Sequence, residues 1–300
     1  MIVLGILLMI SIPVDYAFSS FLSHSIKRKY VRWREVIYDS IDADLLILGS
    51  SRAGVQYDPY IIDTALHINS YNLGIDASCL NRQLLKFRIY KYYQNRNAKM
   101  IIVNIDYYSS LGYTVKNERE QFFPYLLKQF AREEMKRIEP FSFGELYLPM
   151  YRYYKHGVYS IFLDSHRDST LYKGYRGEVA NWDGSAFSEI NTLHFITDDE
   201  RTEKDFDVFL GQMKDQNVKI VFVYAPIYIG LTNKVDNLVD FYETFQSYSD
   251  KYQIPILDYT YHYLSYDTSY FYNALHLNKT GAELFTTKLC HDLDSLGLLK

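Results

Sequence analysis

Five short apolar runs, each with a segment of helical spacing behind it, constrain the fold of this 300-residue chain more than any other feature. None of them alternates between apolar and polar residues, as a strand with one solvated face would. Strands that are apolar on both sides belong to a parallel sheet with helices packed on both faces. The runs are residues 44–49, 70–74, 100–105, 219–225 and 254–258. We therefore expect an α/β fold, a three-layer α/β/α sandwich around a five-stranded parallel sheet.

The regular alternation of strand and helix is interrupted between about residues 114 and 192. This stretch holds two segments of helical pattern, one of them the aromatic run YLPMYRYYKHGVY, followed by a polar loop. Core packing or membrane proximity explains the aromatic run better than a sugar-binding surface does. We interpret the stretch as a helical insertion that shapes a pocket within one domain of residues 43–300.

The first 22 residues are almost entirely apolar and are about long enough to cross a bilayer once. No clear small-residue cleavage site follows them, so we expect an uncleaved transmembrane anchor at residues 1–22. Residues 23–42 would then form a basic juxtamembrane helix. Pro13 and Asp15 weaken the anchor, and the alternative is a buried first helix of a soluble domain.

A basic cluster directly behind the apolar segment bears on its orientation. It consists of Lys27, Arg28, Lys29, Arg32 and Arg34. By the positive-inside rule such a cluster stays in the cytoplasm. The function inferred below instead requires a domain outside the cytoplasm, so the two indications conflict. The cluster favours the alternative that this chain is a peripheral protein that faces the cytoplasm.

Charge and cysteine content exclude some classes of partner and cofactor. The formal net charge of -4 gives no argument for nucleic acid, which usually requires a basic face. The two cysteines, Cys79 and Cys290, do not have the spacing of metal ligands. No metal and no organic cofactor are implied.

Polar residues stand where the first predicted strand ends. Gly49, Ser50, Ser51 and Arg52 follow it directly. In an open parallel sheet the functional site lies at the carboxyl ends of the strands. A serine at that place can present its Oγ and its own backbone N–H to the same space, as acyl transfer requires. The same pattern also describes helix N-caps and phosphate-binding turns.

A histidine near the other end of the chain is the second candidate. His276 lies in the segment YFYNALHLNKTGAELF, residues 270–285, just before a helix that Asn278 is expected to cap. From that position it can extend over the sheet ends and reach a nucleophile on the first strand. A single histidine is more often structural, so this signal is weak by itself.

Three motifs taken together resemble the SGNH (GDSL-like) hydrolase superfamily. They are Gly-Ser-Ser-Arg at 49–52, Asn-Leu-Gly at 72–74 and His-Leu-Asn-Lys-Thr-Gly-Ala at 276–282. The resemblance covers roughly residues 43–300 without the insertion. It looks most like the membrane-anchored envelope branch, which includes D-alanyl-lipoteichoic acid transfer proteins and polysaccharide acetyltransferase-like proteins. It implies a flavodoxin-like sheet and a serine-dependent esterase or O-acyltransferase.

The resemblance assigns roles to individual residues. Ser51 matches the nucleophile, and its backbone N–H matches one donor to the oxyanion. Gly74 matches a glycine whose N–H is another donor. His276 matches the general base, which takes the serine proton and returns it to the leaving group.

Asn273 departs from the family pattern, because the family usually has an aspartate three residues before the histidine. An amide can accept a hydrogen bond from the imidazole, but it cannot stabilise the imidazolium by charge. It can also favour the wrong tautomer of the ring. Asp258, Asp267 or Asp106 are alternatives for orienting His276.

The end of the third strand departs from the family as well, with Val-Asn-Ile-Asp in place of Gly-x-Asn-Asp. Asp106 falls about where the oxyanion asparagine would lie, and an ionised carboxylate there would repel the oxyanion. Asn104 is therefore the candidate donor. We place Ser50, Arg52 and Asp106 next to the substrate. Arg52 would hold an anionic group or, alternatively, pair with an acid at the sheet edge.

These features predict an ester hydrolase or acyltransferase that acts on an acyl group of a cell-envelope polysaccharide or glycolipid through an acyl-Ser51 intermediate. The expected partners are the membrane, through the N-terminal helix, a glycan or glycolipid substrate, and a membrane acyl-transfer protein. The alternative is a catalytically impaired protein of the same fold that binds glycan or an export partner. Asn273 and Asp106 favour this alternative.

Overall fold

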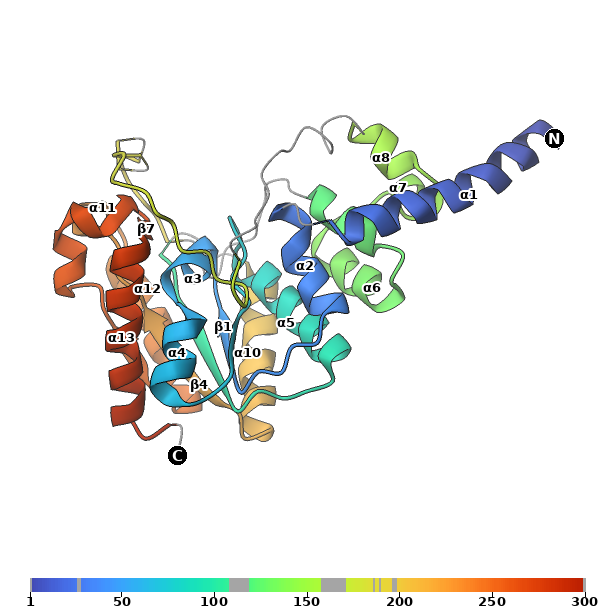
Figure 1. Ribbon diagram of the computed structural model, residues 1–300. Helices are drawn as coiled ribbons and strands as arrows, with labels where there is room; N and C mark the ends of the chain where they lie inside the picture. Colours follow the sequence, from blue (N-terminus) through green and yellow to red (C-terminus); the bar gives the residue numbers. More distant parts are fainter. Residues whose placement is uncertain are drawn as a thin grey trace. The chain divides into compact units, whose positions relative to one another are not determined.

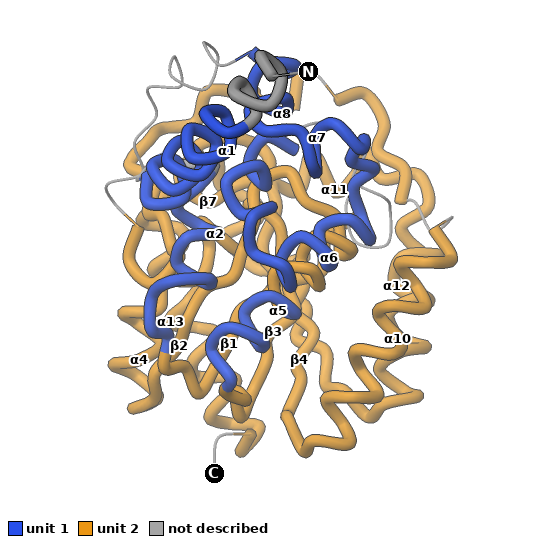
Figure 2. Tube along the Cα trace, turned by 90° about the vertical axis from the view of Figure 1, so that its right-hand side faces the viewer, with its two compact units in different colours: residues 1–41, 88–95, 115–169 blue, residues 42–87, 96–114, 170–300 orange. Residues whose placement is uncertain are grey.

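The computed structural model describes residues 2–25, 28–107, 119–157, 171–185, 187–188, 190–195 and 199–298. The chain divides into two compact units (Figure 2), which we describe one by one. The first comprises residues 1–41, 88–95 and 115–169, and the second comprises residues 42–87, 96–114 and 170–300. The first 41 residues thus share a unit with part of the predicted insertion.

The second unit is built around a five-stranded parallel sheet, as the apolar runs predict. The strands are β1 (Leu45–Leu48), β2 (Ser70–Asn72), β3 (Met100–Asn104), β4 (Lys219–Tyr224) and β5 (Ile256–Asp258). Their order is β2-β1-β3-β4-β5, and every neighbouring pair is parallel. This is the flavodoxin-like order, in which the strand sequence reverses between β1 and β3. The α/β fold and the parallel sheet are therefore confirmed.

Helices cover both faces of this sheet (Figure 1). On one face lie α3 (Ser51–Gln56), α4 (Pro59–Leu66) and α13 (Lys279–Ser295), where Ile62 and Phe285 share a buried core with Ile47 of β1. On the other face lie α10 (Glu200–Asp215) and α12 (Leu238–Tyr252), whose rings pack on Phe222 of β4. Because both faces are covered, β1, β2 and β3 are buried along their whole length.

Side-chain caps fix where the helices begin. Asp58 precedes Pro59 and accepts a hydrogen bond from the backbone N–H of Tyr60 at 2.9 Å, which starts α4. Asn278 accepts one from Gly281 at 3.0 Å and starts α13, as predicted.

Several short helices and strands of the second unit are less clearly indicated by the sequence than the five strands of the sheet. An antiparallel hairpin of β6 (Phe271–Asn273) and β7 (His276–Leu277) precedes α13 and was not predicted. The others are α11 (Ile229–Thr232) and two 3-10 helices, η2 (Tyr263–Tyr266) and η3 (Thr268–Tyr270). Helix α5 (Leu80–Gln94) begins in the second unit and ends in the first.

The described part of the first unit is helical. It contains α1 (Ile2–Ser23), α2 (Arg28–Tyr38), the 3-10 helix η1 (Arg119–Tyr125), α6 (Gln129–Ile138), α7 (Phe143–Tyr147) and α8 (Tyr151–Lys155). The indole N–H of Trp33 donates to Gln121 at 2.6 Å, and the hydroxyl of Tyr125 donates to the Tyr30 carbonyl at 2.8 Å. These two bonds join α2 to η1.

Helix α1 occupies the segment that was expected to be a membrane anchor. In the part of the chain that the structure describes, no helix combines the length and the apolar character that a bilayer crossing requires. The transmembrane helix predicted at residues 1–22 is therefore not supported. Asp15 is buried and forms an ion pair with Arg152 at 2.7 Å, so the acid that weakened the prediction has a structural partner.

A tight turn at residues 172–176 packs beside β2. The Lys173 carbonyl accepts a hydrogen bond from the Asn72 N–H at 2.9 Å. Gly174 has a φ of +79°, and a Cβ at this position would collide with the Asn72 carbonyl oxygen. Only glycine satisfies both the left-handed backbone and the close approach.

We expect Gly174→Ala to lower the free energy of unfolding by about 2–3 kcal/mol, because strain and collision add. Gly184→Ala is the matched control, since Gly184 has a φ of +72° but nothing closer than 3.8 Å to an added Cβ. It should cost only about 1 kcal/mol from the backbone. Urea denaturation of both variants measures the difference, and equal losses would contradict the collision.

Candidate active site

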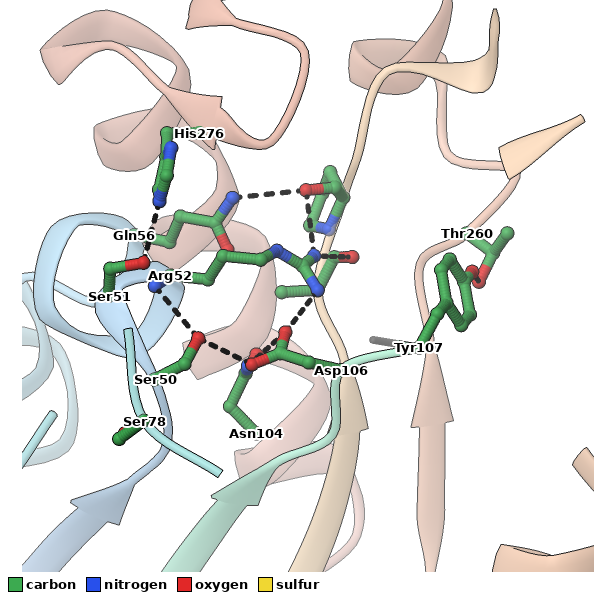
Figure 3. A network of polar contacts seen from close by, with 12 residues as sticks. Ser50, Ser51, Arg52, Gln56, Ser78, Asn104, Asp106, Tyr107, Thr260 and His276 are labelled. Atoms are coloured by element: carbon green, nitrogen blue, oxygen red, sulfur yellow. Dashed lines mark hydrogen bonds and ion pairs between the residues drawn. The ribbon is translucent and has the colours of Figure 1, made fainter. Parts of the chain in front are cut away.

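Ser51 and His276 meet at the carboxyl end of the sheet, although they are 225 residues apart in the chain. Ser51 begins α3 directly after β1, and His276 begins β7. The Ser51 Oγ lies 2.8 Å from the His276 Nε2 (Figure 3), which is a hydrogen-bond distance. Ser51 is half-buried. The structure thus brings together the two residues on which the predicted site depends.

Asn273 holds the other nitrogen of the imidazole. Its Oδ1 lies 2.9 Å from the His276 Nδ1, and it also accepts the backbone N–H groups of Leu275 and His276 at 3.0 Å each. Two backbone donors require an oxygen, which fixes the orientation of the amide. Nδ1 must therefore carry the hydrogen, and Nε2 is left as the acceptor for the Ser51 hydroxyl. The amide selects the tautomer that a general base needs, so the concern about a wrong tautomer does not apply.

The acids considered as alternatives to Asn273 have other partners. Asp258 accepts the backbone N–H of Thr260 at 2.8 Å, and Asp267 accepts that of Ser269 at 2.9 Å. Asp106 forms a buried ion pair with Arg52.

The β6–β7 hairpin explains how Asn273 and His276 come together. The two residues are opposite each other in its register, so one turn places the amide against the ring. The imidazole also stacks on Tyr272, with ring centroids 5.2 Å apart and planes 4° from parallel. Burial raises the pKa of Tyr272 to about 12.

Ser50, the other serine of the motif, is committed to internal contacts. It is buried, and its Oγ caps α3 by accepting the Arg52 backbone N–H at 3.2 Å. The same hydroxyl donates to the Asp106 Oδ2 at 2.5 Å (Figure 3). Of the two adjacent serines, Ser51 is the one whose hydroxyl meets the imidazole.

Arg52 lies beneath the nucleophile. Its side chain is 1% exposed, it pairs with Asp106, and it donates to the Ala225 carbonyl at 2.6 Å and the Pro226 carbonyl at 3.1 Å. The structure therefore shows the alternative in which Arg52 pairs with an acid. Ser50, Arg52 and Asp106 are all buried, and their place next to a substrate stays a prediction.

Two of the predicted oxyanion donors have partners inside the protein. The Gly74 N–H donates to the Asn72 Oδ1 at 2.9 Å. The Asn104 amide is buried, donates to Asp106 at 3.0 Å and accepts the Tyr57 hydroxyl at 2.6 Å. The structure therefore does not offer either group to an oxyanion in the way the sequence suggested.

Gly74 is required for packing, whereas the role of the Ser51 N–H as an oxyanion donor stays a prediction. A Cβ on Gly74 would collide with the backbone of Gly54 in α3. The Ser51 N–H lies in the first turn of α3, where N–H groups have no acceptor within the helix.

Sequence reasoning missed Tyr272, Tyr57 and the carbonyl groups of Ala225 and Pro226. Tyr272 directly precedes Asn273, but side chains of adjacent strand residues are expected to point apart. No sequence signal places Tyr57 against Asn104 or directs two carbonyl groups toward a guanidinium.

No protein-family model matches the sequence, and no curated protein matches it. Solved structures do resemble it. The lipase/acylhydrolase from Enterococcus faecalis is 10% identical, with 85% of this chain and 97% of that chain covered and a TM-score of 0.38. A possible lipase from Chitinophaga pinensis is 11% identical, with coverages of 86% and 100% and a TM-score of 0.42.

A proposed lipolytic protein of the G-D-S-L family from Desulfitobacterium hafniense is 10% identical. The similarity covers 83% of this chain and 99% of that chain, with a TM-score of 0.41. Identities and scores this low assign no activity, so any function has to rest on the geometry of Ser51, His276 and Asn273. The chain is similar to solved proteins described as lipolytic enzymes and acylhydrolases.

Proposed function

We propose that this chain is a serine-dependent ester hydrolase or acyltransferase. One observation carries the proposal. The Ser51 hydroxyl, the His276 imidazole and the Asn273 Oδ1 form a continuous hydrogen-bonded series with distances of 2.8 and 2.9 Å. A base bonded to the hydroxyl and a third group that orients the base are what activates a serine. The series lies at the carboxyl ends of β1 and β3, between which the strand order reverses. Open parallel sheets bind their ligands at this point.

The reaction follows from the tautomer that Asn273 selects. The Ser51 Oγ attacks the ester carbonyl while Nε2 of His276 takes its proton. The imidazolium then gives this proton to the departing alkoxide, and an acyl-Ser51 ester remains. Water or a sugar hydroxyl next gives its proton to Nε2 and attacks the acyl group. Collapse of the second intermediate returns the proton to Ser51 and releases an acid or a new ester.

The proposed substrate is an acyl group of a cell-envelope polysaccharide or glycolipid, handled outside the cytoplasm, with a membrane acyl-transfer protein as a partner. The motifs at residues 49–52 and 276–282 support this part through their resemblance to the envelope branch. Whether water or a sugar hydroxyl reaches acyl-Ser51 distinguishes hydrolysis from transfer.

A second candidate function is non-catalytic binding of glycan or an export partner. One observation favours it, since the Gly74 N–H and the Asn104 amide already have internal partners. A site with fewer oxyanion donors stabilises the tetrahedral intermediate less well. The two candidates differ in the reactivity of Ser51.

The full chain should react with a fluorophosphonate probe and cleave a short-chain p-nitrophenyl ester. We expect Ser51→Ala to abolish both, because its hydroxyl is the one bonded to His276. Ser50→Ala is the matched control. It should keep the labelling but lower the free energy of unfolding by about 1–2 kcal/mol, since the α3 cap and the bond to Asp106 are lost.

Mass spectrometry of the labelled protein and urea denaturation distinguish the outcomes. A native chain that stays unlabelled would favour the binding candidate. Labelling that survives in Ser51→Ala and disappears in Ser50→Ala would assign the nucleophile to Ser50.

Asn273→Asp should raise kcat for the same ester about tenfold. A carboxylate can accept the same three N–H groups, and its bond to a charged imidazolium is stronger by about 1–2 kcal/mol. Asn273→Ala removes the acceptor and should lower kcat by about 100-fold, because the ring loses its orientation. Steady-state kinetics test both variants, and the proposed role of Asn273 fails if neither changes kcat.

A further inference from the structure

Three polar residues of helix α1 face the inside of the first unit. Asp15, Ser19 and Ser23 recur every four residues, which places them on one side of the helix, and all three are buried. The side chains that face away from the unit are apolar or aromatic. Those more than half exposed are Met9, Ile10, Ile12, Tyr16 and Phe21. A helix of a water-soluble unit usually has the opposite arrangement.

A buried polar seam holds α1 in this orientation. Asp15 pairs with Arg152 at 2.7 Å and accepts the Met150 backbone N–H at 2.8 Å. Arg152 also donates to the Ser19 Oγ at 2.9 Å, and Ser19 lies 2.8 Å from the Tyr153 hydroxyl. Turning the helix to bury its apolar side would break this ion pair, which is costly when both partners are buried. The buried ion pair and hydrogen bonds therefore keep the apolar side of α1 exposed.

Helices α7 and α8 lie beside α1 (Figure 1) and also expose apolar and aromatic side chains. A shallow groove of about 350 Å³ is lined by Ser11 of α1 together with Leu148, Pro149, Met150, Tyr151 and Tyr154. Tyr154 is 82% exposed, and Phe143 and Tyr147 are also largely exposed. We call this surface the outer apolar face. It consists of Met9, Ile10, Ile12, Tyr16, Phe21, Phe143, Tyr147, Tyr151 and Tyr154.

The charge of the chain is divided unevenly between its two units. The first unit has 16 Lys and Arg against 11 Asp and Glu, a formal charge of +5. The second has 16 against 25, a formal charge of -9. The cluster of Lys27, Arg28, Lys29, Arg32 and Arg34 follows α1 directly in the sequence. The unit that bears the outer apolar face is therefore cationic overall, which favours an anionic occupant.

We propose that the outer apolar face contacts the surface of a bilayer that contains anionic phospholipid. Polar residues that face inward and apolar residues that face outward are typical of helices in contact with lipid. Tyrosine rings suit the level of the headgroups, and a cationic excess is attracted to anionic lipid. This proposal does not depend on the activity of Ser51.

Flotation with lipid vesicles tests the proposal on the full chain. We expect it to float with vesicles of phosphatidylcholine and phosphatidylglycerol, and less with phosphatidylcholine alone or at high salt. The double variant Ile12→Glu/Tyr16→Glu should reduce the bound fraction at least about tenfold, because it places two charges at the lipid contact. Both positions are exposed, so folding should survive, and circular dichroism checks this.

Two controls separate this proposal from others. Val239→Glu changes an exposed apolar residue of α12 in the second unit and should float like the native chain. Ser51→Ala should also float, so loss of activity leaves this result unchanged. The proposal is overturned if the native chain does not float or if the double variant floats equally well. It is also overturned if the native chain forms dimers through this face, detected by sedimentation, without binding vesicles.

Discussion

The carboxylate of Asp106 joins three strand ends beneath the nucleophile. It accepts hydrogen bonds from Ser50 after β1 and from Asn104 at the end of β3, and it pairs with Arg52, whose guanidinium continues to the Ala225 carbonyl after β4. Removing one partner of a buried ion pair typically costs about 3–5 kcal/mol, because the other charge is left uncompensated. The turn that presents Ser51 is therefore held in place by a network of buried groups.

The two halves of the proposed site are positioned by independent devices. The position of Ser51 is set by the capped start of α3, and the hydrogen bonds of Asp106 hold this start against the sheet. The position of His276 is set by the β6–β7 hairpin, in which Asn273 accepts hydrogen bonds from the ring and from two backbone N–H groups. An aspartate would add charge at this place, whereas the asparagine supplies geometry and the correct tautomer. Asn273 therefore orients the imidazole as an aspartate would, but it gives a charged imidazolium less electrostatic stabilisation.

The parts of the fold that could be predicted depend on patterns local to the sequence. Continuous apolar runs indicated the parallel sheet, and the motifs at residues 49–52 and 276–282 paired Ser51 with His276 through their family resemblance. Whether the Gly74 N–H is available to a substrate could not be predicted, because it depends on where the Asn72 side chain turns. Hydropathy likewise counts apolar residues without showing which side of a helix is covered. The partner of Asp15 lies 137 residues away, beyond the reach of any local pattern.

The turn at residues 172–176 also has a consequence for association between molecules. β2 is an edge strand, and an open edge is a template on which a strand of another chain can add. Here the outward N–H of Asn72 is already bonded to Lys173, whose ammonium group is held by Asp63 and Asn69. The close fit of Gly174 leaves no space for a second backbone at this point. The protein thus closes one edge of its sheet with its own loop, which guards it against edge-to-edge aggregation.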